Sequence, residues 1–213
     1  MSSATALRRG DVAAAIRGAR LFVVLRRVEP VDRLLALAGE LADAGARIFE
    51  VTLDAESAES DLVALRAHLG RRSDGPFVVG AGTVVTMDQL EAARRADADF
   101  AVAPVLDPEI VAAATGGGLP FIPGALTPTE VAAAWAAGAT FVKLFPASAV
   151  GPALVRELRG PIPDVELIPT GGVDGDNAGA YLAAGAVAVG IGSAIVRAEG
   201  AARRAIVATV GAA

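Results

Sequence analysis

The sequence predicts an α/β fold, namely a (β/α)8 TIM barrel with a short N-terminal helix. Three observations support this prediction. Short apolar runs alternate with longer amphipathic stretches along the 213 residues. The apolar runs are continuous, as expected of parallel strands that are covered on both faces. Eight strand–helix units follow one another, and eight is the number that closes a TIM barrel.

The predicted strands are rich in valine, isoleucine and phenylalanine, which favour β-structure. They cover Leu21–Leu25, Ile48–Leu53, Phe77–Val79, Phe100–Ala103, Pro120–Ile122, Phe141–Phe145, Val165–Ile168 and Ala186–Gly190. In a TIM barrel the active site lies at the C-terminal ends of the strands. Polar residues at those ends are therefore the candidates for chemistry.

The amphipathic stretches predict the helices. A short helix around Val12–Arg17 precedes the first strand, and a final helix begins at about Ser193. The others lie near Pro30–Ala44, Ser57–Leu69, Met87–Ala96, Pro108–Ala114, Pro128–Ala137, Gly151–Leu158 and Asp176–Ala184. Thr127 and Asp107 each stand before a proline, a pattern that begins helices. Glycines stand where helices should end, at Gly45, Gly138 and Gly185.

The domain organisation follows from the same pattern. No strand is followed by a dinucleotide-binding fingerprint, which favours the barrel over a doubly wound open sheet. No linker, low-complexity segment or charge run marks a second domain, and the unit at residues 44–49 recurs at 137–141 and 184–187. We expect one barrel domain over residues 1–213.

Composition excludes several classes of function. A net charge of −5 argues against nucleic-acid binding, which needs clustered positive charge. Cysteine is absent and there is one histidine, so thiolate and multi-histidine metal sites are excluded. No apolar run reaches the roughly 20 residues of a membrane helix, and residues 1–9 carry no signal-peptide pattern. We expect a cytoplasmic protein without membrane or nucleic-acid partners.

Lys143 is the only lysine, beside eighteen arginines. It stands inside the apolar strand Phe141–Phe145. Burial disfavours the charged ammonium and so favours a neutral amine, which can attack a carbonyl carbon. A lysine at a strand end whose head reaches solvent is the alternative. Arginine can replace such a surface lysine but cannot form a Schiff base, which favours a catalytic role for Lys143.

Glu50 lies within the second predicted strand, Ile48–Leu53. A carboxylate that lines a barrel can serve as a general acid/base. A structural partner for Arg26 or Arg47 is the alternative. A nucleophilic lysine in the same barrel favours the catalytic interpretation, because imine chemistry needs a proton shuttle.

Glycine segments follow strands seven and eight of the predicted barrel. Thr170-Gly171-Gly172 and Gly192-Ser193 stand where TIM barrels hold phosphate, and glycine lets backbone N–H groups approach the anion. The helix after Ser193 would point its positive end there. A further segment, Gly80–Thr83, could hold a carboxylate or be a simple turn.

In their order along the chain, these motifs resemble the class I aldolases for 2-keto-3-deoxy-6-phosphogluconate (KDPG) and 4-hydroxy-2-oxoglutarate (KHG). The matching segments are Glu-Val-Thr-Leu, Gly-Ala-Gly-Thr-Val, Ala-Pro, Pro-Gly, Val-Lys-Leu-Phe-Pro-Ala, Pro-Thr-Gly-Gly and Ile-Gly-Ser. They extend from about Val23 to Val196. The resemblance implies a cofactor- and metal-independent lyase with a small keto acid substrate, assembled as a homotrimer.

The resemblance also implies residue roles. Lys143 would form the imine with pyruvate, and Glu50 would move protons through water. Arg26 would approach the substrate carboxylate. The pyruvate end would be lined by Thr83, Pro104, Phe145 and Thr170. The phosphate would be held by Gly171, Gly172, Gly192 and Ser193.

Two positions depart from the family pattern. The best-known members carry a carboxylate-binding arginine four residues after the glutamate, where this chain has Asp54. Arg26 or Arg27 must then bind the carboxylate, or Asp54 points away. Ala103-Pro104-Val105 also replaces the usual Ser-Pro-Gly. Aldolases for 2-keto-3-deoxy-6-phosphogalactonate (KDPGal) likewise lack that arginine and share the Leu-Arg strand end, so they are an alternative.

Two further alternatives belong to other classes. One is a phosphate-binding barrel isomerase with Glu50 as base and Lys143 as an electrostatic group. The other is a non-catalytic barrel that binds a sugar-acid phosphate. The first forms no borohydride-trapped adduct with pyruvate, and the second releases no pyruvate from any aldol.

Overall fold

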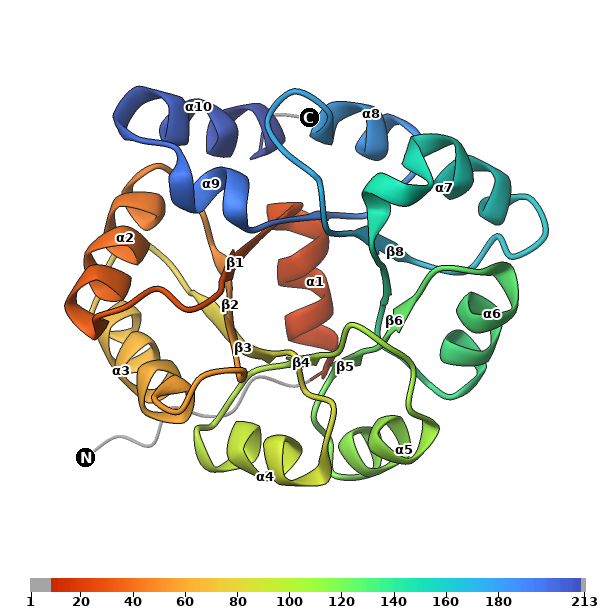
Figure 1. Ribbon diagram of the computed structural model, residues 1–213, viewed down its shortest axis with the longest axis horizontal. Coiled ribbons are helices and arrows are strands. Elements are labelled where there is room, and N and C mark those ends of the chain that lie inside the picture. Colours follow the sequence, from red (N-terminus) through yellow and green to blue (C-terminus); the bar gives the residue numbers. More distant parts are fainter. Residues whose placement is uncertain (1–8, 212–213) are drawn as a thin grey trace.

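The computed structural model describes residues 9–211. Residues 1–8, which underlie the expectation about a signal peptide, and 212–213 lie outside this range. Helices and strands alternate along the described chain, with the strands in the middle and the helices around them (Figure 1). No helix within residues 9–211 is both long enough and apolar enough to cross a bilayer.

The strands are short and every strand pair is parallel. Their bounds are β1 (Leu21–Leu25), β2 (Ile48–Thr52), β3 (Val78–Gly82), β4 (Ala101–Val102), β5 (Phe121–Ile122), β6 (Gly124–Ala125), β7 (Val142–Leu144), β8 (Leu167–Pro169) and β9 (Val189–Ile191). They form a six-stranded sheet, β5-β4-β3-β2-β1-β9, and a three-stranded sheet, β6-β7-β8.

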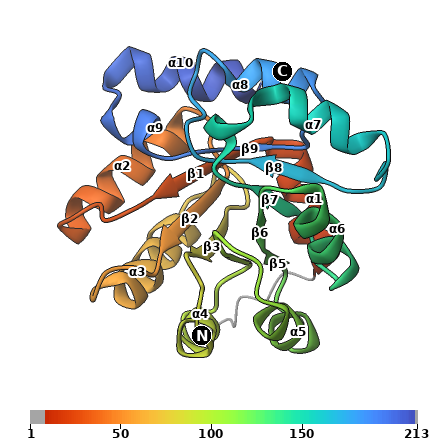
Figure 2. The same cartoon turned by 45° about the vertical axis from the view of Figure 1, so that its right-hand side comes forward.

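Two local features connect the sheets. Pro123, which has no N–H to donate, separates β5 from β6, so the chain passes directly from the fifth predicted strand, Pro120–Ile122, into a strand of the second sheet. A parallel bridge between Thr170 and Gly190 joins the end of β8 to β9. The strand order therefore follows the chain order from β1 to β9, and Figure 2 shows the same succession from a second side.

The helices other than α1 surround the strands, and α1 lies in the centre of the view in Figure 1. Their bounds are α1 (Arg9–Ala19), α2 (Val31–Asp43), α3 (Ala58–Gly70), α4 (Met87–Arg95), α5 (Pro108–Gly116), α6 (Pro128–Ala136), the 3-10 helix η1 (Ala147–Ala149), α7 (Gly151–Arg159), α8 (Ala178–Ala183), α9 (Ser193–Arg197) and α10 (Gly200–Gly211). The predicted starts at Thr127 and Asp107 are confirmed, because both side chains accept backbone N–H groups of the first turn. Gly45, Gly138 and Gly185 follow helix ends with positive φ, as expected.

Helix α1 covers one end of the strands. Its Val12, Ala13 and Ile16 are buried in one apolar cluster with residues at or just before the starts of most strands. These partners include Phe22, Ile48, Val78, Phe100, Phe141 and Ala188. Because α1 closes the end where the strands begin, the opposite end, where they finish, is left for a site.

The structure corrects two predicted boundaries. Strand β3 extends to Gly82, so Gly80–Gly82 are strand and not loop. Gly80 and Gly82 have no side chains, which leaves room for Phe100, just before β4, and for Glu50 of β2. The predicted final helix is two helices, because the chain turns extended at Ala198. The Arg203 guanidinium from α10 donates to the carbonyls of Ile195 and Val196, which would otherwise lack partners at the end of α9.

Candidate active site

Lys143 lies in the middle of β7 and is 4% exposed. Its backbone N–H donates to the carbonyl of Pro123, so the strand pairing holds its position. The ammonium lies 5.3 Å from the centroid of the Phe145 ring. The only lysine of the sequence is therefore buried, and the solvent-reaching alternative is wrong.

Glu50 reaches Lys143 from the other sheet. It lies on β2, in register with Val24 of β1 and Gly80 of β3, and is 2% exposed. Its Oε1 is 3.8 Å from Lys143 Nζ and has no hydrogen-bond partner among the described residues. Burial of either charge alone is costly, so the two groups compensate each other. The structure thus pairs a buried amine with a carboxylate that retains a free lone pair.

Glycines on the neighbouring strands make room for the polar groups of the site. A Cβ on Gly82 of β3 would lie 2.0 Å from Glu50 Oε1. A Cβ on Gly190 of β9 would lie 2.3 Å from Thr170 Oγ1. Any side chain at either position would displace a site residue, which explains glycine there.

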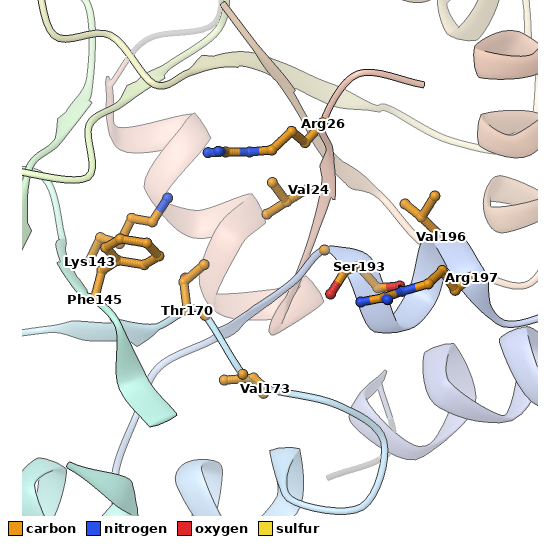
Figure 3. Close-up of a pocket in the computed structure, with 12 residues that line it drawn as sticks. Val24, Arg26, Lys143, Phe145, Thr170, Val173, Ser193, Val196 and Arg197 are labelled. Carbon is orange, nitrogen blue, oxygen red and sulfur yellow. The ribbon is translucent and has the colours of Figure 1, made fainter. Parts of the chain in front are cut away.

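A cavity of about 380 Å³ opens at the C-terminal ends of β1, β7, β8 and β9 (Figure 3). Its lining residues are Val24, Arg26, Lys143, Phe145, Thr170, Gly171, Gly172, Val173, Gly192, Ser193, Val196 and Arg197. Three of these are cationic and, within residues 9–211, none is acidic. The cavity is therefore suited to an anionic ligand.

Eight of the eleven predicted site residues line this cavity, all except Glu50, Thr83 and Pro104. Glu50 lies beneath it in a cavity of about 10 Å³ that also touches Lys143 and Thr170. Thr83 accepts a hydrogen bond from Arg26 Nη2 at 3.1 Å. The backbone of Pro104 lies against Gly124, away from the cavity lining.

Sequence reasoning missed four lining residues, Val24, Val173, Val196 and Arg197. The valines carry no signal, because their apolar type is that of any core residue. Arg197 stands four residues after Ser193, a spacing that places both side chains on one helix face. Because Ser193 was already a candidate, this spacing could have identified Arg197 as a second cavity residue.

Asp54 faces the arginines of the β1 end. Its Oδ2 is 3.6 Å from Arg26 Nη1 and 3.4 Å from Arg27 Nε, and its carbonyl accepts from Arg27 Nη2 at 2.9 Å. Only Arg26 of the two arginines is among the described lining residues. Asp54 is not itself among these lining residues, so it pairs with Arg26 from outside the cavity lining.

The described residues hold no group of three or more His, Cys, Asp or Glu side chains that could bind a metal ion. The site brings together the amine of Lys143 and the carboxylate of Glu50. Together they can form an imine with a carbonyl compound and move its protons.

Comparisons with known proteins agree with this chemistry. The family model described as KDPG and KHG aldolase matches residues 12–209. The 2-dehydro-3-deoxy-6-phosphogalactonate aldolase of Escherichia coli K12 is 34% identical over 84% of this chain and 85% of its own length.

Two solved structures share the fold. A 4-hydroxy-2-oxoglutarate/2-dehydro-3-deoxyphosphogluconate aldolase has a TM-score of 0.83 and 36% identity, covering 95% of this chain and 98% of its own. The KDPG aldolase of Legionella pneumophila, solved with pyruvate captured as a covalent carbinolamine, has a TM-score of 0.81 and 29% identity over 94% and 96% of the two chains. The buried amine, its carboxylate and these matches agree: the chain belongs to the KDPG and KHG aldolase family, whose members are carbon–carbon lyases.

Proposed function

We propose that this chain is a Schiff-base aldolase in which Lys143 is the nucleophile and Glu50 the general acid/base. Its substrate is a 2-keto-3-deoxy-6-phospho sugar acid, with KDPG first, which it cleaves to pyruvate and glyceraldehyde 3-phosphate. KHG, which yields pyruvate and glyoxylate, is a further substrate. The observation that carries the proposal is the buried pair of Lys143 Nζ and Glu50 Oε1, 3.8 Å apart beneath an anion-suited cavity.

The reaction begins at the substrate C2 carbonyl. Glu50 accepts a proton from Lys143, and the free amine attacks C2 to give a carbinolamine. Protonation of the C2 oxygen through Glu50 releases water and forms the iminium. The small cavity that joins Glu50, Lys143 and Thr170 has about the volume that one water molecule needs, so it suits proton transfer through water.

Cleavage then uses the iminium as an electron sink. Glu50 takes the proton of the C4 hydroxyl, the C3–C4 electron pair moves toward C2, and glyceraldehyde 3-phosphate leaves. The enamine is protonated at C3, and water adds to C2. Pyruvate departs and the Lys143 amine is restored.

The cavity supplies two binding ends for this substrate. Arg26 lies on the same side as Lys143 and is assigned to the C1 carboxylate, with Phe145 and Thr170 around the pyruvate carbons. Thr83 supports Arg26 through its hydroxyl. The glycine segments at Gly171, Gly172, Gly192 and Ser193 are assigned to the phosphate. Pro104 is assigned a supporting role in the cavity wall, because its backbone packs against Gly124.

Asp54 is expected to orient Arg26 toward the carboxylate. Asp54→Asn should raise KM for the aldol about three- to fivefold with little change in kcat, because an exposed ion pair is worth at most about 1 kcal/mol. Steady-state pyruvate release measures both constants. Asp74→Asn is the matched control, since Asp74 pairs with Arg72 outside the cavity lining. A lower KM would show that Asp54 competes with substrate for Arg26, against this assignment.

KDPGal is the second candidate substrate. Asp54 in place of the carboxylate-binding arginine favours it, as does the relative from Escherichia coli, which is named for that substrate. A lactate-dehydrogenase-coupled assay over KDPG, KDPGal and KHG tests the proposal. We expect pyruvate from a phosphorylated aldol, with a lower rate from KHG. A protein that binds these compounds and releases no pyruvate is the non-catalytic alternative.

We further propose that the strands close into one (β/α)8 barrel that forms a single domain over residues 1–213. Two features support closure. A bridge joins Thr170 to Gly190, and the chain passes through Pro123 from β5 of one sheet to β6 of the other. Family resemblance supports a homotrimer, and a cytoplasmic location agrees with the small metabolite substrate.

A further inference from the structure

We propose that Arg197 recognises the substrate phosphate and makes this enzyme selective for phosphorylated aldols. The inference rests on the proposed function and concerns the far end of the same cavity. Sequence patterns assign only glycines and Ser193 to that end, and these offer uncharged donors. A guanidinium adds a fixed positive charge and a planar pair of donors that matches phosphate oxygens.

Arg197 lies at the end of the cavity where the glycine segments and Ser193 meet. It ends α9, one turn after Ser193, and both residues line the cavity. Arg197 Nε donates to the carbonyl of Ser193 at 3.2 Å, which holds the guanidinium beside that residue. Figure 3 shows both groups on the opposite side of the cavity from Lys143.

Arg197 has no carboxylate partner among residues 9–211. Several other arginines pair with carboxylates, as Arg17 does with Glu166 and Arg95 with Glu59. Within residues 9–211 Arg197 forms no ion pair, and its Nη1 and Nη2 have no hydrogen-bond partner. The terminal donors of this guanidinium are therefore free to bind an anion.

The positive charges of the cavity lining lie at both of its ends. Arg26 and Lys143 lie at one end and Arg197 at the other (Figure 3). A 6-phospho keto acid carries a carboxylate on C1 and a phosphate on C6, with the reacting carbonyl beside the carboxylate. When C2 is bonded to Lys143, the phosphate is directed toward Ser193 and Arg197. KHG, a five-carbon diacid without phosphate, has no group that extends as far.

Two substrates that differ only in the phosphate test the proposal. KDPG and its unphosphorylated analogue, 2-keto-3-deoxygluconate, are compared by pyruvate release in the wild type and in Arg197→Gln. We expect kcat/KM for KDPG to fall about tenfold or more, mostly through KM, because a charged hydrogen-bond donor is lost. The unphosphorylated analogue should change less than about twofold on the same argument.

Two further variants distinguish recognition from structure. Arg197→Lys keeps the charge without the planar fork and should recover part of the loss. Arg204→Gln, on α10, removes one exposed positive charge outside the cavity lining and should leave both substrates unchanged. An equal loss of both substrates in Arg197→Gln would overturn the proposal, as would an unchanged KM for KDPG.

Binding of inorganic phosphate separates this inference from the proposed function. Titration calorimetry should show phosphate binding to the wild type and about tenfold weaker binding to Arg197→Gln. If the wild type releases no pyruvate but phosphate binding still falls in the variant, the aldolase proposal fails and the phosphate site stands. If phosphate binds both proteins equally, or neither, the assignment of Arg197 is wrong.

Discussion

Replacement of Lys143 by arginine should abolish aldol cleavage, with kcat at least about 10⁴-fold lower. Arginine keeps the positive charge beside Glu50 but cannot form an imine, so the variant removes the nucleophile and leaves the charge pair. The coupled assay for pyruvate measures the loss. Unchanged thermal unfolding of the variant shows that the fold is intact.

Trapping of the imine identifies the reacting amine. Borohydride with pyruvate should label the peptide that contains Lys143 in the wild type and leave that peptide unlabelled in Lys143→Arg. Lys143 is the only lysine, so the N-terminal amine is the one competing primary amine. Pyruvate release without a labelled Lys143 peptide would sink the Schiff-base mechanism and favour an electrostatic role for this residue.

Replacement of Glu50 by glutamine should lower kcat by about 10²- to 10³-fold, the usual contribution of a positioned acid/base. The amide has nearly the same shape but cannot accept the protons of the carbinolamine or of the C4 hydroxyl. The imine should still be trapped by borohydride at Lys143, more slowly than in the wild type. Slow trapping with low turnover separates loss of the proton shuttle from loss of the nucleophile.

A second variant perturbs Glu50 without changing it. Gly82→Ala places a methyl group 2.0 Å from the original position of Glu50 Oε1, so the carboxylate must move and turnover should fall. Gly39→Ala, on α2, is the control, because its new Cβ meets His68 at an ordinary 3.6 Å. Wild-type turnover in both Glu50→Gln and Gly82→Ala would place the general base elsewhere.

The strand β3 shows why parts of the fold cannot be predicted from the sequence. Glycine is a weak strand former, so the sequence predicts a loop at Gly80–Gly82. In the structure these residues pair with β2, and their small size accommodates Phe100 and Glu50. Pairing with the neighbouring strand β2 makes these residues a strand, and the local sequence contains no sign of that partner. The division at Ala198 has the same kind of cause, a contact from Arg203 in the following helix.

The alternating α/β pattern, the helix starts at Thr127 and Asp107, and the position of Lys143 within an apolar strand could all be predicted from the sequence. Those features depend on side-chain type and short spacing. Three spatial relations appear only in the folded structure. Glu50 lies 3.8 Å from Lys143, and Asp54 faces Arg26. Arg197 lines the same cavity as Arg26 and Lys143. These relations join residues far apart in the chain, and the register of parallel strands is what brings them together.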